Sequence, residues 1–392
     1  MDAMNKQLQA IADNYTGQDM YAGIGWRVEK AGEVIASGTS GTSDEARKTP
    51  LQDDALYRIY SMTKPVVSVM ALILVQRGQL RLSDFLMQYI PAFATTQVLC
   101  DRGSEAPLRA ITIEDLLTHR SGLSYDFVPN CPVAAQYAEI DLIKRTEQSL
   151  EEFANTIAEF PLAFQPGTQW RYSVATDVLA RVLEVASGQS LDTLLEETLF
   201  GPLGMSDTGF YVPPEKQSRL VPLYGFETID LTPAELPPHE LILLDAEPFY
   251  PSRPGHNALR GGLGLFSTSA DYCKFATMLL TGTTADGTAL LSPAMNRLMV
   301  ANRIPESQMP LDIGPMVFPG YGFCLIGRVM HDLGRAMSLT NPGEFGWEGA
   351  AGTYFWVDRE EQMVGVVMSQ FLATYLPMRD DMRGAVYATL GD

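Results

Sequence analysis

The chain has 392 residues, of which 46% are hydrophobic and 19% are charged. This length corresponds to two or three domain-sized units, and the apolar fraction is ample for buried cores. The formal net charge of −19 argues against a protein that binds nucleic acid or an anionic membrane through a basic face.

The start of the chain lacks a basic stretch followed by an apolar core, so we predict no secretory signal. The longest apolar run, residues 66–75, falls short of the roughly 20 residues that span a bilayer. No pair of cysteines has C-x-x-C spacing, so we expect small buried thiols and neither a zinc site nor a disulfide framework. These cysteines are Cys100, Cys131, Cys273 and Cys324. Together these features predict a cytoplasmic protein.

The first part of the chain has a helical pattern over residues 1–15. Two strand patterns follow, residues 21–28 and 34–38, and the turn at residues 30–32 between them predicts a β-hairpin. A short extended segment, residues 57–60, then leads into the next helix.

The middle of the chain, from about residue 80 to 199, has a helical period. A capping-box pattern predicts a helix over residues 113–118, which Gly122 ends. Another helix is predicted over residues 177–186, before Gly188. This part is expected to form a helical subdomain inserted into the chain.

Nine of the 25 prolines fall within residues 212–254. So many prolines argue against a regular core element and predict a long ordered loop, either a wall of a substrate pocket or a surface connector. A glycine-rich turn at residues 261–268 lacks the lysine and the spacing of a phosphate-binding loop. Strand patterns return at residues 354–357 and 363–368, before a last predicted helix.

Strands at both ends of the chain, with helices between them, imply that the two ends pair in one sheet. We therefore predict an α+β fold with a mostly antiparallel sheet flanked by helices. Residues 1–79 and 256–392 would form this sheet domain. Residues 80–255 would form the mainly helical subdomain, including the proline-rich loop.

Ser61 and Lys64 are three residues apart, and Pro65 follows them. A helix accepts proline only in its first turn, so a helix should start at or just after Ser61. The hydroxyl and the amine would then lie on one face, next to unpaired N–H groups that can stabilise an oxyanion. On its own, this pair fits an active site and an ordinary helix cap equally well.

Three separated motifs give the pair a context. In chain order they are Ser61-Met62-Thr63-Lys64, Tyr172-Ser173-Val174 and Trp347-Glu348-Gly349. With them, nearly the whole chain resembles the serine β-lactamase and penicillin-binding-protein superfamily. The resemblance is closest to the class C β-lactamase-like esterases called family VIII carboxylesterases, and it implies the β-lactamase/transpeptidase-like fold.

The resemblance implies that Ser61 is the nucleophile and Lys64 its general base, sharing the proton with Tyr172. A lysine or a phenol can act as a base near neutral pH only if burial or a neighbouring charge shifts its pKa. Each could tune the other, so the identity of the main base stays open. The oxyanion hole would combine the backbone N–H groups of Ser61 and Ala350.

Five further residues are expected at the substrate on the same grounds: Trp347, Gly349, Tyr125, Val174 and Glu348. Trp347 stands where the superfamily has a cation, Val174 where it has an asparagine, and Glu348 where it has a hydroxyl residue. Gly349 would let the substrate approach the strand edge closely. Tyr125 would line the cleft or pack beside it. The three departures favour esters over β-lactams.

The implied function is a serine carboxylesterase that hydrolyses short-chain or aromatic esters through an acyl-enzyme on Ser61. Its partner is a small-molecule ester, and no cofactor is implied. No two histidines have metal-ligand spacing, so no metal is predicted. Three alternatives stay open: an acyltransferase, a weak β-lactamase or D-amino-acid peptidase on the same site, and a non-catalytic binding or scaffold protein.

Overall fold

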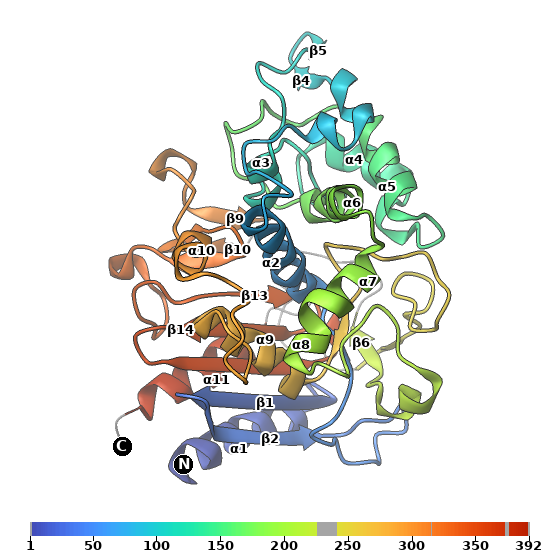
Figure 1. Ribbon diagram of the computed structural model, residues 1–392. Coiled ribbons are helices and arrows are strands. Elements are labelled where there is room, and N and C mark those ends of the chain that lie inside the picture. The colour runs from blue at the N-terminus through green and yellow to red at the C-terminus, as the bar shows by residue number, and fades with distance from the viewer. Residues whose placement is uncertain (1, 226–240, 315, 373–375, 391–392) are drawn as a thin grey trace.

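The computed structural model describes residues 2–225, 241–314, 316–372 and 376–390. A large sheet lies at one end of the molecule and a group of helices at the other, and both ends of the chain lie beside the sheet (Figure 1).

The large sheet has seven antiparallel strands among the described residues, in the order β11-β12-β13-β14-β15-β1-β2. They are β1 (Gly23–Lys30), β2 (Glu33–Gly41), β11 (Tyr321–Phe323), β12 (Arg328–Met330), β13 (Phe345–Gly349), β14 (Thr353–Asp358) and β15 (Met363–Ser369). The first strand pairs directly with the last, and Trp26 lies opposite Val367. The prediction that the two ends of the chain share one antiparallel sheet in an α+β fold is confirmed.

Helices cover both faces of this sheet. Successive side chains of a strand point to opposite faces, so each strand contributes to two cores. In β14, Tyr354 and Trp356 belong to a core shared with the terminal helices α1 (Asp2–Gly17) and α11 (Met378–Ala388). Phe355 and Val357 point to the other face, into a core shared with α2 and α9. Because both faces are buried, every residue of β14 is buried.

Of the remaining described helices, α2, α3, α5 and α7 pack around α6, toward the end away from the sheet, whereas α9 lies against the sheet (Figure 1). In chain order the inner helices are α2 (Thr63–Gln76), α3 (Ile113–Leu117), α4 (Pro132–Glu139), α5 (Leu150–Ala158), α6 (Ala175–Ser187), α7 (Leu191–Leu195), α8 (Gly201–Leu203), α9 (Ser269–Thr281) and α10 (Pro293–Met299). The helices predicted over 113–118 and 177–186 are confirmed to within about two residues. Thr112 caps α3 by accepting a hydrogen bond from the Asp115 amide, and Gly188 ends α6 with a φ of 71°.

Short strands complete the described residues: β3 (Tyr57–Arg58), β4 (Val98–Cys100), β5 (Gly103–Glu105), β6 (Leu223–Gly225), β7 (Leu243–Leu244), β8 (Phe266–Ser267), β9 (Leu311–Ile313), β10 (Met316–Phe318) and β16 (Phe371–Leu372). The prediction that residues 212–254 hold no regular core element is wrong, because β6 and β7 lie within them. β6 is buried and pairs in parallel with β16, so the segment is anchored to the strand that follows β15. Residues 226–240 of the predicted loop lie outside the described residues.

The cysteine prediction is wrong at one position. Cys131, Cys273 and Cys324 are buried, but Cys100 is exposed because it ends the small outer strand β4. In the part of the chain that the structure describes, no helix has the length and apolar character needed to cross a bilayer.

Candidate active site

The chain reaches Ser61 through a tight turn. β3 pairs with β8, and the Ile59 amide donates to the Leu265 carbonyl at 3.0 Å. A single 3₁₀ turn, Tyr60–Met62, follows and runs straight into α2. Tyr60 has a φ of 45°, which is unusual for an aromatic residue. The prediction that a helix begins just after Ser61 is confirmed.

Lys64 lies one turn along, and its side chain is buried behind Ser61. Its Nζ donates to Ser61 Oγ at 3.2 Å, to the Tyr125 hydroxyl at 2.8 Å and to the Gly262 carbonyl at 2.6 Å. These three oxygens carry no formal charge. Burial lowers the pKa of Lys64 to about 7, although the nearby Asp177 charge opposes the shift. A large fraction of the amine is therefore neutral near neutral pH.

Tyr172 lies beside this pair. Lys64 Nζ is 4.6 Å from the centroid of its ring, and the indole N–H of Trp347 donates to its hydroxyl at 3.3 Å. Burial raises the pKa of Tyr172, and its hydrogen bonds with Ser61 and Trp347 offset only part of that rise. The three predicted catalytic side chains are thus brought together, with a phenol that stays protonated next to an amine that readily loses its proton.

Tyr125 has a larger part in this arrangement than lining a cleft. Its hydroxyl accepts the 2.8 Å hydrogen bond from Lys64, and its ring stacks on Phe127 with centroids 4.8 Å apart. The ring also lies 5.2 Å from that of Tyr172. Lys64 therefore lies between two phenol rings, and its hydrogen bond to a phenol goes to the Tyr125 hydroxyl.

Two further residues that support Lys64 were not identified from the sequence. The Asp177 carboxylate accepts a hydrogen bond from the Gly262 amide at 3.0 Å, and this orients the carbonyl that receives the lysine. A Cβ on Gly262 would collide with the Asp177 carboxylate and the Tyr125 hydroxyl. The glycine-rich run at 261–265 was the feature of the sequence that could have pointed to this contact. Glycine is needed there because a side chain at 262 would collide with Asp177 and Tyr125.

Ser61 and Ala350, the predicted oxyanion donors, line one cavity. Gly349 explains how they come together. A Cβ there would collide with the Ile59 carbonyl oxygen and the Thr353 hydroxyl, so only glycine allows β13 to approach the Ser61 turn. The close approach that Gly349 permits is to the protein's own backbone, and Gly349 also lines the cavity, where it was expected to meet the substrate.

The cavity has a volume of about 400 Å³ and a mostly apolar lining that includes several aromatic rings. Its charged lining residues are Asp126, Asp141, Lys144, Glu348 and Arg379. Tyr172 and Trp347 form one side. Phe249 and Tyr250, from the proline-rich segment, also line the cavity, which favours the pocket wall over the surface connector of the two alternatives left open for this segment. A cavity of this size and character suits a small, mostly apolar molecule.

Two predicted substrate residues need comment. Val174 is fully buried at the start of α6, where its amide donates to the Ser124 carbonyl at 3.2 Å, and it does not line the cavity. Its position next to a helix start turns the side chain into the core. Glu348 does line the cavity, and its carboxylate lies 2.6 Å from the Arg379 guanidinium. Among the described residues, no group of three or more potential ligands could hold a metal ion.

The amino-acid sequence is similar to a protein-family model and to several known proteins. A model of the Beta-lactamase family matches residues 8–387. Protein Rv1367c of Mycobacterium tuberculosis (strain ATCC 25618 / H37Rv) is 34% identical over 358 residues, which cover 88% of this chain and 84% of that protein. Esterase EstB of Burkholderia gladioli is 29% identical over 390 residues, with 97% and 95% covered.

Among solved structures, EstCE1 is similar to this chain with a TM-score of 0.83. It is described as a hydrolase with promiscuous acyltransferase activity. The similarity covers 98% of this chain and 99% of that one at 24% identity, so it bears on the fold alone.

Proposed function

Because the chain belongs to the β-lactamase family of serine hydrolases, with EstB-like family VIII esterases among its homologues, we propose that it is a carboxylesterase acting through Ser61. Its substrates are short-chain or aromatic esters. One observation supports this most directly: the Ser61 hydroxyl is hydrogen-bonded to a buried amine whose pKa is about 7, and it opens onto an aromatic cavity.

In the proposed acylation step, Ser61 Oγ attacks the ester carbonyl carbon and gives up its proton. Lys64 accepts this proton, because burial lowers the pKa of the amine and raises that of Tyr172. The carbonyl oxygen becomes an oxyanion, to which the amides of Ser61 and Ala350 donate. Each such donor is typically worth about 2.7 to 4 kcal/mol in the transition state.

The tetrahedral intermediate then collapses and the bond from carbon to the alcohol oxygen breaks. The leaving alkoxide takes up the proton from Lys64, with Tyr172 positioned by Ser61 and Trp347 to pass it on. In the second half-reaction water attacks the acyl carbon and gives a proton to Lys64. The bond from that carbon to Ser61 Oγ then breaks, and Oγ takes the proton back from Lys64. The products are an alcohol and a carboxylic acid, and the enzyme returns to its starting state.

The aromatic walls argue for the substrate class. Trp347 occupies the place of a cation, and the rings of Tyr172, Phe318 and Phe323 contact it. Such a surface favours an apolar acyl or alcohol group. The apolar cavity also favours a second candidate function on the same site, acyl transfer, because an organic alcohol that occupies it would compete with water for the acyl-enzyme.

The test is hydrolysis of p-nitrophenyl acetate, butyrate, octanoate and benzoate by wild type and by Ser61→Ala. We expect the substitution to lower kcat/KM by at least about 1,000-fold. Ser37→Ala, on the exposed edge strand β2, makes the same chemical change outside the cavity and should leave the rate as it was. Full activity in Ser61→Ala would refute the proposal.

Acyl transfer is tested in the same assay by adding n-butanol and measuring butyl ester against free acid. A butyl ester that forms with wild type but not with Ser61→Ala would show that the acyl-enzyme accepts alcohols. Free acid alone at every alcohol concentration would exclude this second function.

A further inference from the structure

A cation does reach the cavity, although the sequence motif that should supply one has Trp347 instead. Arg379, in the first turn of α11, lines the same cavity as Ser61 and Ala350. It comes from a part of the chain far from the three motifs. The positive charge of Arg379 therefore affects which esters the cavity can bind.

Glu348 neutralises this cation at the cavity wall. Its Oε2 lies 2.6 Å from Arg379 Nη1 and 4.0 Å from Arg328 Nη1. Burial opposes ionisation of Glu348, but the charges of Arg379 and Arg328 outweigh it and lower the pKa of the carboxyl. At neutral pH Arg379 is therefore held in an ion pair at this wall. The cavity is also lined by Lys144, Asp126 and Asp141, which come from another part of the chain.

The charges behind this pair cannot replace Glu348. Arg328 and Arg383 share the fully buried Glu344, at 3.9 and 3.1 Å. Asp380 lies 3.4 Å from Arg383 but is largely exposed. Three guanidinium groups thus face two buried carboxylates, and the loss of the Glu348 charge would leave Arg379 without a buried anion.

We propose that Glu348 masks Arg379 and thereby sets the charge preference of the site: neutral esters are accepted, and esters that bear a carboxylate near this wall are rejected. The proposal rests on the proposed esterase function and adds a specificity determinant to it. A substrate carboxylate would approach the Glu348 carboxylate in a poorly solvated cavity, where repulsion between like charges is strong. With Glu348 uncharged, the planar guanidinium of Arg379 would instead bind that carboxylate.

The competing explanation is that the ion pair only fastens α11 to β13. Glu348→Gln separates the two, because it keeps the shape of the side chain and an oxygen that can accept from Arg379 but removes the charge. Arg379→Gln removes the cation, and the double variant removes both. A purely structural pair would change the melting temperature without changing the preference between neutral and anionic esters.

The experiment compares kcat/KM for two matched pairs of esters at about pH 7.5. p-Nitrophenyl hexanoate and mono-p-nitrophenyl adipate differ by a carboxylate on the acyl side. Phenyl acetate and 4-acetoxybenzoate differ by a carboxylate on the alcohol side. In at least one pair, we expect wild type to prefer the neutral ester and Glu348→Gln to shift that ratio toward the anionic ester by about tenfold.

The double variant shows whether Arg379 is responsible. We expect the gain for the anionic ester to fall when Glu348→Gln is combined with Arg379→Gln. An unchanged ratio in Glu348→Gln for both pairs would overturn the proposal, and so would a double variant that keeps the whole gain. If Glu348→Gln does not fold, Arg379→Gln tests the proposal by itself. It leaves the Glu348 charge without its cation, so the preference in kcat/KM for the neutral over the anionic ester should increase severalfold.

The neutral esters keep this test apart from that of the proposed function. Their hydrolysis by wild type reports whether the protein is an esterase at all, and the neutral-to-anionic ratio reports the role of Glu348. Wild type that hydrolyses no ester would refute both, whereas wild type that hydrolyses both members of each pair equally would refute only the charge preference.

Discussion

Two groups of polar side chains in this molecule handle charge in opposite ways. Lys64 is a buried cation whose direct partners are uncharged oxygens, and its pKa falls to about 7. Arg219 lies between two carboxylates, 2.8 Å from Asp207 and 3.0 Å from Asp54. This pairing with Arg219 lowers the pKa of Asp207 to about 2. Lys64 can therefore gain or lose a proton near neutral pH, whereas Arg219 and its two carboxylates stay charged.

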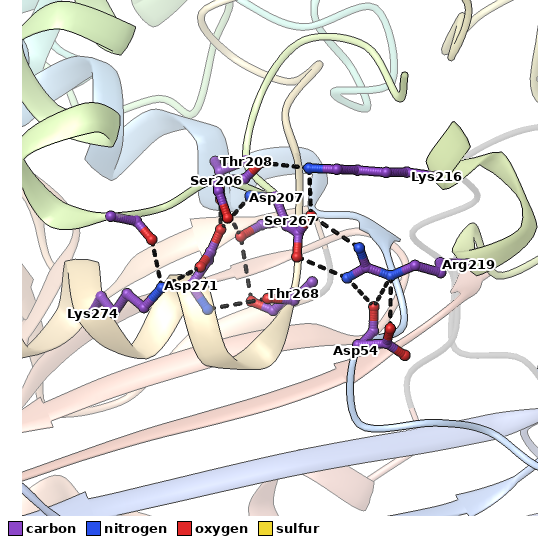
Figure 2. Close-up of polar contacts among 11 residues, drawn as sticks. Asp54, Ser206, Asp207, Thr208, Lys216, Arg219, Ser267, Thr268, Asp271 and Lys274 are labelled. Carbon is purple, nitrogen blue, oxygen red and sulfur yellow. Dashed lines mark hydrogen bonds and ion pairs between the residues drawn. The ribbon is translucent and has the colours of Figure 1, made fainter. Parts of the chain in front are cut away.

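The second group is a network of polar contacts that links Asp54, Asp207 and Asp271 through Arg219 and the Asp207 backbone (Figure 2). Lys216 Nζ lies 2.7 Å from Asp207, and the Asp207 amide donates to the buried Asp271 carboxylate at 2.7 Å. Asp271 is in the first turn of α9, directly after β8. Because β8 pairs with the strand that enters the Ser61 turn, we infer that charge pairing at this point secures the segment that brings Gly262 to Lys64.

The largest effect should come from removing the unpaired cation. Lys64→Met should lower kcat/KM by about 1,000-fold, because no neutral amine is left to accept the Ser61 proton. The melting temperature should hold or rise, because a buried amine is replaced by an apolar chain of similar length. Hydrolysis of p-nitrophenyl butyrate and a thermal melt measure both.

Lys216→Met is the matched control from the paired group. It should leave the rate unchanged and lower the melting temperature slightly, because it breaks a partly exposed ion pair outside the cavity. The contrast between the two groups fails if Lys64→Met retains its activity, or if the two lysine variants lose activity equally.

A smaller loss should follow when the Ser61 turn is pushed away from β13. Gly349→Ala places a methyl group against the Ile59 carbonyl oxygen, so the amides of Ser61 and Ala350 would no longer face a common point. We expect kcat to fall by about 100-fold, the cost of one oxyanion donor. Gly384→Ala in α11 meets nothing within 4 Å and serves as the control. Equal rates in the two variants would contradict the packing argument.

The pH dependence sharpens the comparison further. In the proposed mechanism Lys64 is the base and acts only when neutral, so kcat/KM should rise as the pH passes through its pKa of about 7. The Asp177 charge raises that pKa, so in Asp177→Asn the rise should move to lower pH by about one unit. Profiles between about pH 5 and 9 measure this shift. The same change at Asp207 should leave the midpoint where it is, and a midpoint that moves upward in Asp177→Asn would show that the base is another group.

Strands and helix ends that depend on a short stretch of sequence could be predicted. Strand-like segments predicted β1, β2, β14 and β15, and their places at the two ends of the chain implied one sheet. The spacing of Ser61, Lys64 and Pro65 gave the helix start, because proline is restricted to the first turn whatever surrounds it. Tyr172 and Ala350 needed the resemblance to a family, since no local period links them to Ser61.

Contacts set by packing were not predictable. Gly262 lies about 200 residues from Lys64, and nothing in its neighbourhood says which cation its carbonyl receives. Arg379 belongs to a helix whose pattern describes only how it packs on the sheet. Val174 had the right place in a motif, but the start of α6 turns it inward. The residues around Ser61 could thus be predicted from sequence, whereas the groups that shift their pKa values or position them were seen only in the fold.

The smallest expected effect concerns the paired group itself. Because Arg219 and Lys216 lower the folded pKa of Asp207 to about 2, ionised Asp207 stabilises the folded state fully above about pH 5, and this contribution is lost as the pH falls toward 2. Asp207→Asn should therefore lower the free energy of unfolding at about pH 7 by about 1 kcal/mol, a value reduced by the solvent that reaches the pair.

Urea unfolding of wild type and Asp207→Asn, at about pH 7 and about pH 3, measures this difference. The difference should shrink at the lower pH, because unfolded wild type then takes up a proton at Asp207 that the folded state does not bind, and the variant has no group to titrate there. A difference of the same size at both pH values would mean that the ion pair contributes nothing, and that hydrogen bonds to Asp271 alone hold the segment. The esterase rate at neutral pH should stay unchanged in this variant, because the charges that it disturbs stabilise the frame and take no part in the proton transfer.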